Sequence, residues 1–444
     1  MERDKFSRFG ALVVIAGSAV GLGNIWRFPY MVATNGGAAF ILLYIFFVLI
    51  ICLPVMVAEL SIGRRSRCNA YRALDKLSSA PAAKAAGRGF GLMYVLIPTL
   101  ILSYYCVIGG STVDYFLRAC GITAHGGNGM QLLWTLIFLL LTAAVVAGGV
   151  KGGIEKFSKI MMPLLFIIVL LIALRSATLP ATGSGWTARD GLDFMFRPDF
   201  SKLGFKSCLA ALGQAFFSLS IGSGVLMTYG SYVNPKDKLF KTAGEIAFFD
   251  LLFAIIAGCA VIPAVFALEA DPVNVLANNT DSRLVFNILP EVFPAMPLGK
   301  LIGAVFFFSL ILAALTSSIS QMEVPVSYLT EEKKLSRPLA VALVFVVAIA
   351  IGSACTLRGQ VLNALDALCA NWLMPLGGIA ATVFVGWIMG FDELHDELSS
   401  RGLHKTGKLS SRIIHLLIRY IAPIGVHAAG QRACTPVGDC PWQA

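Results

Sequence analysis

The chain has 444 residues, of which 57% are hydrophobic and only 14% are charged. A soluble domain carries about a quarter charged residues, so this composition excludes an ordinary soluble protein. The net charge of +10 could indicate a nucleic-acid partner, but the basic residues gather in alternate loops between apolar runs, which argues against one.

Apolar runs of about 20 residues, the length that crosses a bilayer, recur along the chain and predict an all-α polytopic membrane protein. We expect spans at residues 10–34, 38–61, 89–117, 131–149, 158–176, 205–232, 241–268, 299–329, 338–356 and 361–389. A further run begins near 411 and loses its apolar character after Pro423. This pattern predicts one transmembrane domain over 1–424, with a partial eleventh span at 411–424, and an atypical polar tail over 425–444.

The basic residues lie before the first span, between the second and third, and in later loops of the same side. They include Arg3, Lys5, Arg8, Arg64, Arg65, Arg67, Lys151, Lys156, Lys159, Lys236, Lys238, Lys333 and Lys334. The positive-inside rule makes these loops cytoplasmic, which predicts a multi-pass protein of the inner (plasma) membrane with a cytoplasmic N-terminus. The first 23 residues also resemble a signal peptide, but their motif continues through Tyr30 into a second span, which disfavours that interpretation.

The first predicted span is interrupted within residues 17–30 by three glycines, an asparagine and an arginine. Lipid cannot satisfy freed backbone groups, so irregular backbone at that depth must face protein, water or a bound solute. In transporters, interrupted helices of this kind point to the substrate site.

A second interruption lies at residues 213–224, in the sixth predicted span. Five spans lie between the starts of the two broken helices, so the halves at about 10–176 and 205–389 are predicted to be inverted repeats. Close helix packing would explain either stretch alone. Two polar, glycine-rich breaks at corresponding positions favour a binding site near the bilayer midplane.

A broken helix suits a zwitterion bound together with a cation. The free N–H groups of the second half-helix attract a carboxylate, and unwound carbonyls can ligate a hard cation such as Na⁺. Hydroxyls at 316–320 could ligate the cation or pack against their own helix, and both interpretations stay open. Arg27 and Asp366 could close the outer side of the site or form a static pair.

Several motifs resemble those of the neurotransmitter:sodium symporters, in particular their bacterial amino-acid transporters. They follow in order over residues 1–424: the run at 17–30, Asn35-Gly36-Gly37, Ala58-Glu59-Leu60, Ser103-Tyr104-Tyr105, the run at 213–220 and Leu315-Thr316-Ser317-Ser318. The resemblance implies the five-plus-five inverted-repeat (LeuT-type) fold with broken helices 1 and 6. It also implies that an amino acid is imported with Na⁺ by alternating access.

The resemblance further implies roles for individual residues. One sodium would be held by Ala19, Asn24, Ser218 and Asp250, and a second by Gly17, Val20, Ala313, Thr316 and Ser317. Substrate would be bound by Ser18, Ala19, Leu22, Gly23, Ile101, Tyr105, Phe217, Ser218, Ser220, Ser223, Ser317 and Gln321. The outer gate would be Arg27 and Asp366, and the inner gate Arg3 and Glu331.

Some residues depart from the family pattern. Phe6 stands where a tryptophan is more typical, and Asp250 stands where many relatives have asparagine. A carboxylate beside a sodium would supply the negative charge that animal relatives obtain from chloride, so we expect chloride-independent transport. Ser223 and Gln321 replace the bulky apolar groups of leucine-selective relatives, which favours a larger or partly polar amino acid.

Two alternatives remain: a Na⁺-dependent transporter of another small amine or betaine, and a non-transporting ligand-binding sensor. No nucleophile–base set, phosphate loop or Cys-x-x-Cys pair occurs, so we expect neither an enzyme nor an organic cofactor. The expected partners are the amino acid, Na⁺ and the lipid bilayer. The polar stretch after 424 predicts a truncation or a shifted reading frame near 425, or else a short interfacial ending.

Overall fold

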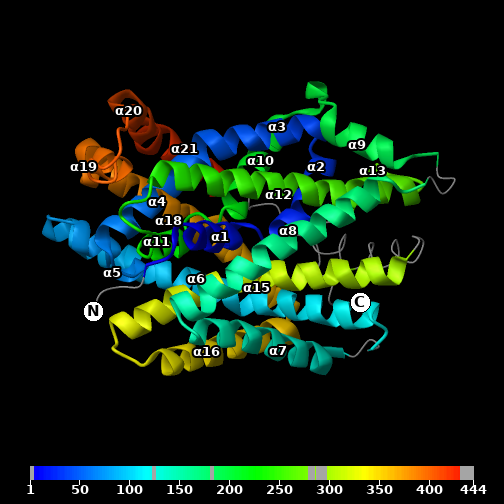
Figure 1. The fold of residues 1–444 in the computed structure, drawn as a ribbon, viewed down its shortest axis with the longest axis horizontal. Coiled ribbons are helices and arrows are strands. Elements are labelled where there is room, and N and C mark those ends of the chain that lie inside the picture. Colours follow the sequence, from blue (N-terminus) through cyan, green and yellow to red (C-terminus); the bar gives the residue numbers. More distant parts are fainter. Residues whose placement is uncertain (1–4, 123–126, 181–184, 279–285, 287–297, 431–444) are drawn as a thin grey trace.

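The computed structural model describes residues 5–122, 127–180, 185–278, 286 and 298–430. Within these ranges all regular structure is helical. Figure 1 shows long helices running side by side along the longest axis of the molecule, with α1 (Arg8–Ala19) in the middle. The helices α9 and α13 lie at one end of this bundle, and α5, α19 and α20 lie at the other.

The first half of the chain contains the first broken helix and four long helical segments. Its elements are α1, η1 (Gly23–Arg27), α2 (Phe28–Thr34), α3 (Ala38–Phe47), η2 (Val48–Cys52), α4 (Leu53–Ser66), α5 (Ala70–Leu77), α6 (Pro81–Ala119), α7 (Gly127–Ala147), η3 (Val150–Glu155) and α8 (Lys156–Ala177).

The second half repeats this pattern and adds a last helix. Its elements are α9 (Ala188–Phe196), η4 (Phe200–Lys202), α10 (Phe205–Ser218), α11 (Val225–Gly230), α12 (Leu239–Leu268), α13 (Pro272–Asn278), α15 (Gly299–Glu331), α16 (Arg337–Leu357), α17 (Gly359–Leu368), η7 (Cys369–Leu373), α18 (Met374–Val383), η8 (Phe384–Met389), α19 (Gly390–Leu398), α20 (Lys408–Leu416), η9 (Leu417–Ile421) and α21 (Ala422–Gly430).

Nine helices of the described part are long and apolar enough to cross a membrane. A tenth span is formed if α1 and the helix over residues 23–34 are counted together, since they pass the same test as a pair bent by 53°. The predicted break in the first span is therefore confirmed. The second predicted break separates α10 from α11.

The last helix differs from its prediction. The apolar run was expected to end at 424, but α21 continues to Gly430 and the segment from Lys408 to Gly430 is long and apolar enough to span a membrane. Small residues explain the continuation, because Gly425 packs directly against Ile51 and Gly430 against Pro375. The prediction rested on the polarity of the residues after 424 and did not include these packing contacts.

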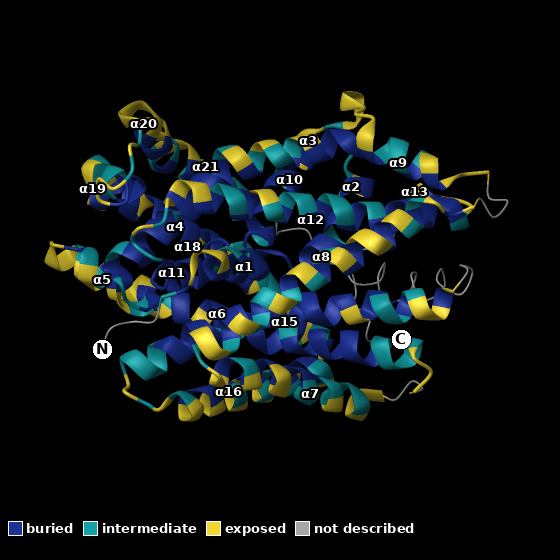
Figure 2. Ribbon diagram, in the orientation of Figure 1, coloured by how far each residue is buried: buried dark blue, intermediate teal, exposed yellow. Residues whose placement is uncertain are grey.

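Burial separates a central group of helices from an outer one. Most residues of α1 and α18 are buried, whereas Figure 2 shows many exposed residues along α7, α8 and α16. The helix α1 packs against α8, α12 and α15, so it lies at the centre of the bundle. In a membrane protein such exposed apolar faces contact lipid.

Two helices next to the core touch through glycines. A Cβ atom on Gly63 in α4 would lie 2.0 Å from the carbonyl oxygen of Met227 in α11. A Cβ atom on Gly230 in α11 would lie 2.8 Å from the carbonyl oxygen of Leu60 in α4. The backbones of α4 and α11 are therefore in direct contact, as small residues allow in membrane helices.

Candidate functional site

The first break places glycines where neighbouring helices approach closely. The helix α1 ends at Ala19, Val20 is extended, and the chain becomes helical again at Gly23. A Cβ atom on Gly21 would lie 2.6 Å from the Ser317 hydroxyl oxygen, and one on Gly23 would lie 2.9 Å from the Phe217 ring. Only glycine allows α10 and α15 to approach the unwound backbone this closely.

The second break is held by left-handed backbone and by a buried carboxylate. Ser220, Gly222 and Gly224 have φ values of 52°, 81° and 81°. Glu59 of α4 accepts a hydrogen bond from the Gly222 N–H at 2.6 Å. The Ser220 hydroxyl donates to the carbonyl oxygen of Ser18 at 2.9 Å, which joins the two breaks directly.

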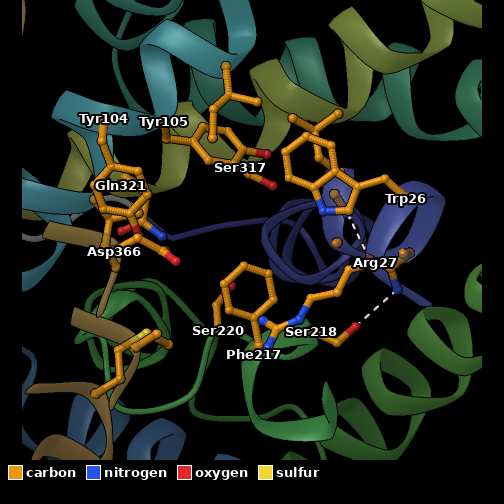
Figure 3. A pocket seen from close by; sticks show the side chains of 18 of the residues that line it. Trp26, Arg27, Tyr104, Tyr105, Phe217, Ser218, Ser220, Ser317, Gln321 and Asp366 are labelled. Carbon is orange, nitrogen blue, oxygen red and sulfur yellow. Dashed lines mark hydrogen bonds between the residues drawn. The ribbon is translucent and has the colours of Figure 1, made fainter. Parts of the chain in front are cut away.

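A cavity of about 230 Å³ lies between the two breaks, and Figure 3 shows the side chains that surround it. All but one of the predicted substrate residues line it: Ser18, Ala19, Leu22, Gly23, Ile101, Tyr105, Phe217, Ser218, Ser220, Ser317 and Gln321. The exception is Ser223, whose placement at the pocket floor is corrected. Its hydroxyl donates to the Ser220 carbonyl at 2.7 Å, because the left-handed turns on either side direct the residue into the protein.

Tyr105 and the start of the second half-helix meet at one wall of the cavity. The Tyr105 hydroxyl interacts with the backbone N–H of Leu22 and with the Ser317 side chain. A hydroxyl and backbone N–H groups at a helix start are suitable partners for a carboxylate. The structure thus brings together the groups that the sequence predicted for the carboxylate of an amino acid.

Asp250 of α12 is completely buried beside the first break. The Asn24 side-chain amide donates to Oδ1 of Asp250 at 2.8 Å, and the Ser218 hydroxyl donates to the same atom at 2.8 Å. The Tyr44 hydroxyl donates to Oδ2 at 3.1 Å, a contact that sequence reasoning missed. These three donors are all neutral groups, so they do not compensate a carboxylate charge.

Four of the five residues predicted for the second sodium, Gly17, Val20, Ala313 and Thr316, also meet. The Thr316 hydroxyl lies 2.9 Å from the carbonyl oxygen of Ala313 and 3.5 Å from that of Val20. A Cβ atom on Gly17 would contact Cβ of Thr316 at 3.5 Å. Unwound carbonyls and hydroxyls are the oxygen donors that a hard monovalent cation prefers. Groups of three or more His, Cys, Asp or Glu that could hold a metal do not occur in the described residues.

The predicted outer gate residues both line the cavity. The Arg27 guanidinium lies over the Phe217 ring, 4.6 Å from its centre, in cation–π geometry. Asp366 contacts the hydroxyl of Tyr104 from α6. Figure 3 shows Arg27 beside Phe217, with Asp366 near Gln321 and Tyr104 across the cavity. An Arg27–Asp366 gate therefore stays a prediction.

The inner gate can be compared with its prediction only in part, because Arg3 lies outside the described residues. Its predicted partner Glu331 accepts hydrogen bonds from the backbone N–H and the side-chain amide of Asn69, at 3.1 and 3.0 Å. Phe6 packs edge-on between Tyr229 and Tyr232, with ring centres 5.9 and 5.5 Å away.

A third buried carboxylate lies towards this end of the bundle. Glu323 of α15 is fully buried, and the Tyr232 hydroxyl donates to its Oε1 at 2.8 Å. The Arg337 guanidinium forms an ion pair with the same carboxylate and donates to the Val146 carbonyl at 2.8 Å. Glu323 therefore has a permanent counter-cation.

Several lining residues were not predicted as site residues: Trp26, Ile108, Leu362, Asn363, Ala370, Asn371 and Met374. Most belong to the segment from α17 to α18, at spacings of three or four residues around Asp366. Residues at that spacing share one face of a helix. Once Asp366 was predicted to line the site, its neighbours at three and four residues could have been predicted to line it too.

Comparisons with known proteins agree with this architecture. The model of the sodium:neurotransmitter symporter family matches residues 3–125 and 120–428. The chain is 34% identical to the uncharacterized sodium-dependent transporter YhdH of Bacillus subtilis over 95% of both chains. It is 33% identical to an uncharacterized sodium-dependent transporter of Haemophilus influenzae, over 89% of this chain and 91% of the relative.

A solved structure gives the same result. The crystal structure of MhsT in complex with L-phenylalanine superposes with a TM-score of 0.83 at 36% identity, covering 97% of this chain and all of that one. This likeness confirms the predicted all-α, LeuT-type fold with its two broken helices. The chain therefore belongs to the sodium:neurotransmitter symporter family.

Proposed function

We propose that this protein imports an L-amino acid with a large side chain together with Na⁺, by alternating access, across a plasma membrane in which its N-terminus is cytoplasmic. The observation that carries the proposal is the cavity between the two breaks. It is lined by Tyr105 and by the start of the second half-helix. It is also lined by Asn24 and Ser218, which together with Tyr44 and Asp250 form the Asp250 cluster. These groups are the donors and acceptors that a zwitterion and a cation need. Oxygen-rich groups around Thr316 support a second Na⁺.

The Asp250 cluster supports coupling to Na⁺ without chloride. Among the described residues, the buried carboxylate accepts hydrogen bonds from the neutral groups of Asn24, Ser218 and Tyr44. A charge taken out of water needs a compensating charge, and a sodium among Ala19, Asn24, Ser218 and Asp250 would supply it. Because the carboxylate is part of the protein, no added anion is needed to balance the ion.

Gln321 and the size of the cavity support a large or partly polar substrate side chain. The Oε1 atom of Gln321 is buried and has no hydrogen-bond partner within the described part of the chain. A polar group in a pocket selects against ligands that leave it unpaired. MhsT, whose structure resembles this one, was crystallised with L-phenylalanine. We therefore place L-phenylalanine and larger or hydroxylated aromatic amino acids first among the substrates.

Uptake into proteoliposomes tests the proposal. The full chain is reconstituted, and accumulation of labelled L-phenylalanine is followed with an inward Na⁺ gradient, with K⁺ in its place, and with gluconate replacing chloride. We expect accumulation only with Na⁺ and at the same rate without chloride. Competition by unlabelled amino acids and by betaine then ranks the substrates.

Three outcomes would contradict parts of the proposal. Na⁺-dependent binding of the label without accumulation would indicate a sensor and not a transporter. Competition by betaine alone would indicate another substrate class. A strict preference for leucine or alanine would overturn the role given to Gln321.

A further inference from the structure

We propose that a groove between the start of α1 and the start of α8 binds the headgroup of an anionic phospholipid of the surrounding bilayer. The groove encloses about 640 Å³ and lies away from the substrate cavity, with no shared lining residue. It is lined by Lys5, Phe6, Ser7, Lys151, Glu155, Lys156, Lys159 and Ile160. The inference rests on the membrane location of the protein and is independent of its substrate.

The charge of the groove favours an anion. Four lysines and one glutamate line it, which leaves three net positive charges. Glu155 is already engaged, because it accepts from the Ser7 hydroxyl at 2.5 Å and forms an ion pair with Lys159 at 2.7 Å. Lys151 and Lys156 are exposed at its rim. Clusters of lysines at the membrane surface attract anionic lipid headgroups, and basic pockets beside membrane helices bind them.

An apolar stripe on α8 continues from the groove. Ile160 lines the groove and is 56% exposed, and Ile167, Leu171 and Leu174 are 55%, 60% and 57% exposed. Their spacings of seven, four and three residues place them on one helix face, which Figure 2 shows as a row of exposed residues along α8. At about 1.5 Å per residue this face extends about 21 Å from the groove.

This combination matches a lipid better than a soluble anion. One leaflet of hydrocarbon is about 15 Å deep, so the stripe is long enough to contact an acyl chain along its whole length. A soluble phosphate would contact only the lysines, whereas the stripe on α8 already faces the hydrocarbon of the bilayer. An anionic phospholipid uses both features at once, with its headgroup between the lysines and its chains along α8.

A bound headgroup would connect two parts of the protein that are far apart in sequence. Ser7 caps the start of α1, where its hydroxyl accepts from the Gly10 N–H at 3.0 Å, and Phe6 lies in the same groove wall. The opposite wall belongs to η3 and α8. Lipid binding should therefore hold the segment before α1 against α8 and stabilise the folded protein.

Thermal unfolding of the purified full chain tests this inference. Phosphatidylglycerol and phosphatidylcholine are added separately to the detergent-solubilised protein, and the melting temperature is measured for wild type and K156Q/K159Q. The matched control is K236Q/K238Q, which removes two exposed lysines from the loop before α12. Ligands that bind only the folded state raise its stability.

We expect phosphatidylglycerol to raise the wild-type melting temperature by several degrees more than phosphatidylcholine does. K156Q/K159Q should lose at least half of that difference, whereas K236Q/K238Q and the charge-keeping K156R/K159R should retain it. Equal loss in K156Q/K159Q and K236Q/K238Q would overturn the proposal, because it would show a general charge effect. A full shift with inorganic phosphate alone would also overturn it, because the site would then bind a soluble anion.

Should K156Q/K159Q melt lower than wild type in phosphatidylcholine, the single variant K156Q replaces it, since Lys156 takes no part in the Glu155 ion pair. Native mass spectrometry gives an independent readout. The fraction of protein that carries one phosphatidylglycerol should be the same for wild type and K236Q/K238Q and clearly lower for K156Q. An equal fraction in K156Q and wild type would contradict the assignment. None of these measurements uses transport, so failure here is distinguishable from failure of the proposed function.

Discussion

Two buried carboxylates in this protein have opposite surroundings. Both Asp250 and Glu323 are completely buried. Glu323 forms an ion pair with Arg337 and accepts a hydrogen bond from Tyr232. Asp250 has hydrogen-bond donors in Asn24, Ser218 and Tyr44, which are all neutral. Glu323 therefore has a cation of the protein beside it, whereas the three groups described around Asp250 are neutral, as the sodium proposed at that position requires.

The largest effect should come from breaking the permanent pair. Replacing Arg337 with Met leaves Glu323 buried without its cation, and removing one partner of a buried pair costs about 3–5 kcal/mol. We expect R337M to lower the melting temperature strongly, by the same amount in Na⁺ and in K⁺. The double variant E323Q/R337M should recover most of the loss, and an unrecovered double variant would show that Arg337 acts through other contacts.

A smaller and ion-dependent effect should follow at the other carboxylate. D250N removes the charge but keeps a side chain of the same shape. We expect the Na⁺ concentration for half-maximal uptake to rise at least about tenfold, a loss of about 1.4 kcal/mol in cation binding. Uptake should also become dependent on chloride. Unchanged uptake at every Na⁺ and chloride concentration would remove the role proposed for Asp250.

The second cation region should respond to Na⁺ but not to chloride. T316V removes the hydroxyl that lies between the carbonyls of Ala313 and Val20. We expect a several-fold loss of Na⁺ affinity with no chloride dependence. The matched control is S318A, because the Ser318 hydroxyl contacts Thr142 and not the first break. Equal effects of T316V and S318A on Na⁺ affinity would indicate general packing of α15.

The smallest effect should be on substrate choice. Q321L replaces the side-chain amide, whose Oε1 has no hydrogen-bond partner among the described residues, with an apolar group of similar size. We expect competition by leucine to improve by up to about tenfold relative to polar aromatic amino acids, with Na⁺ dependence unchanged. S223A serves as the control, since Ser223 does not line the cavity. A selectivity change in S223A as large as that in Q321L would contradict this assignment.

The two helix breaks could be predicted from the sequence because glycines and polar residues inside an apolar run are explained by little other than close helix packing or a binding site. It also placed Asn24, Ser218 and Asp250 together through the family resemblance, and the structure brings them into contact. It missed Tyr44, because a tyrosine in an apolar span is usually explained by packing. Its partner Asp250 is 206 residues away in sequence.

Two further differences between prediction and structure, at Ser223 and at the end of the last helix, depend on backbone geometry and packing that cannot be read from the sequence. Ser223 looked like a pocket residue by position, but the turns at Gly222 and Gly224 direct its hydroxyl to Ser220. The end of the chain looked too polar to continue as a helix, yet glycines in α21 pack against Ile51 and Pro375. In both cases the contacts with neighbouring residues, which the sequence does not show, decided the outcome.

The direct contact between α4 and α11 has a mechanical consequence. With Gly63 against Met227 and Gly230 against Leu60, the two backbones pack without intervening side chains, so we expect α4 and α11 to move together. If the cavity opens by movement of helices, we therefore expect that movement to leave the contact between α4 and α11 in place. The ion pair between Arg64 of α4 and Glu397 of α19 at 2.8 Å links this pair of helices to the end of the bundle, so a joint movement of α4 and α11 would either stretch that ion pair or displace α19 as well.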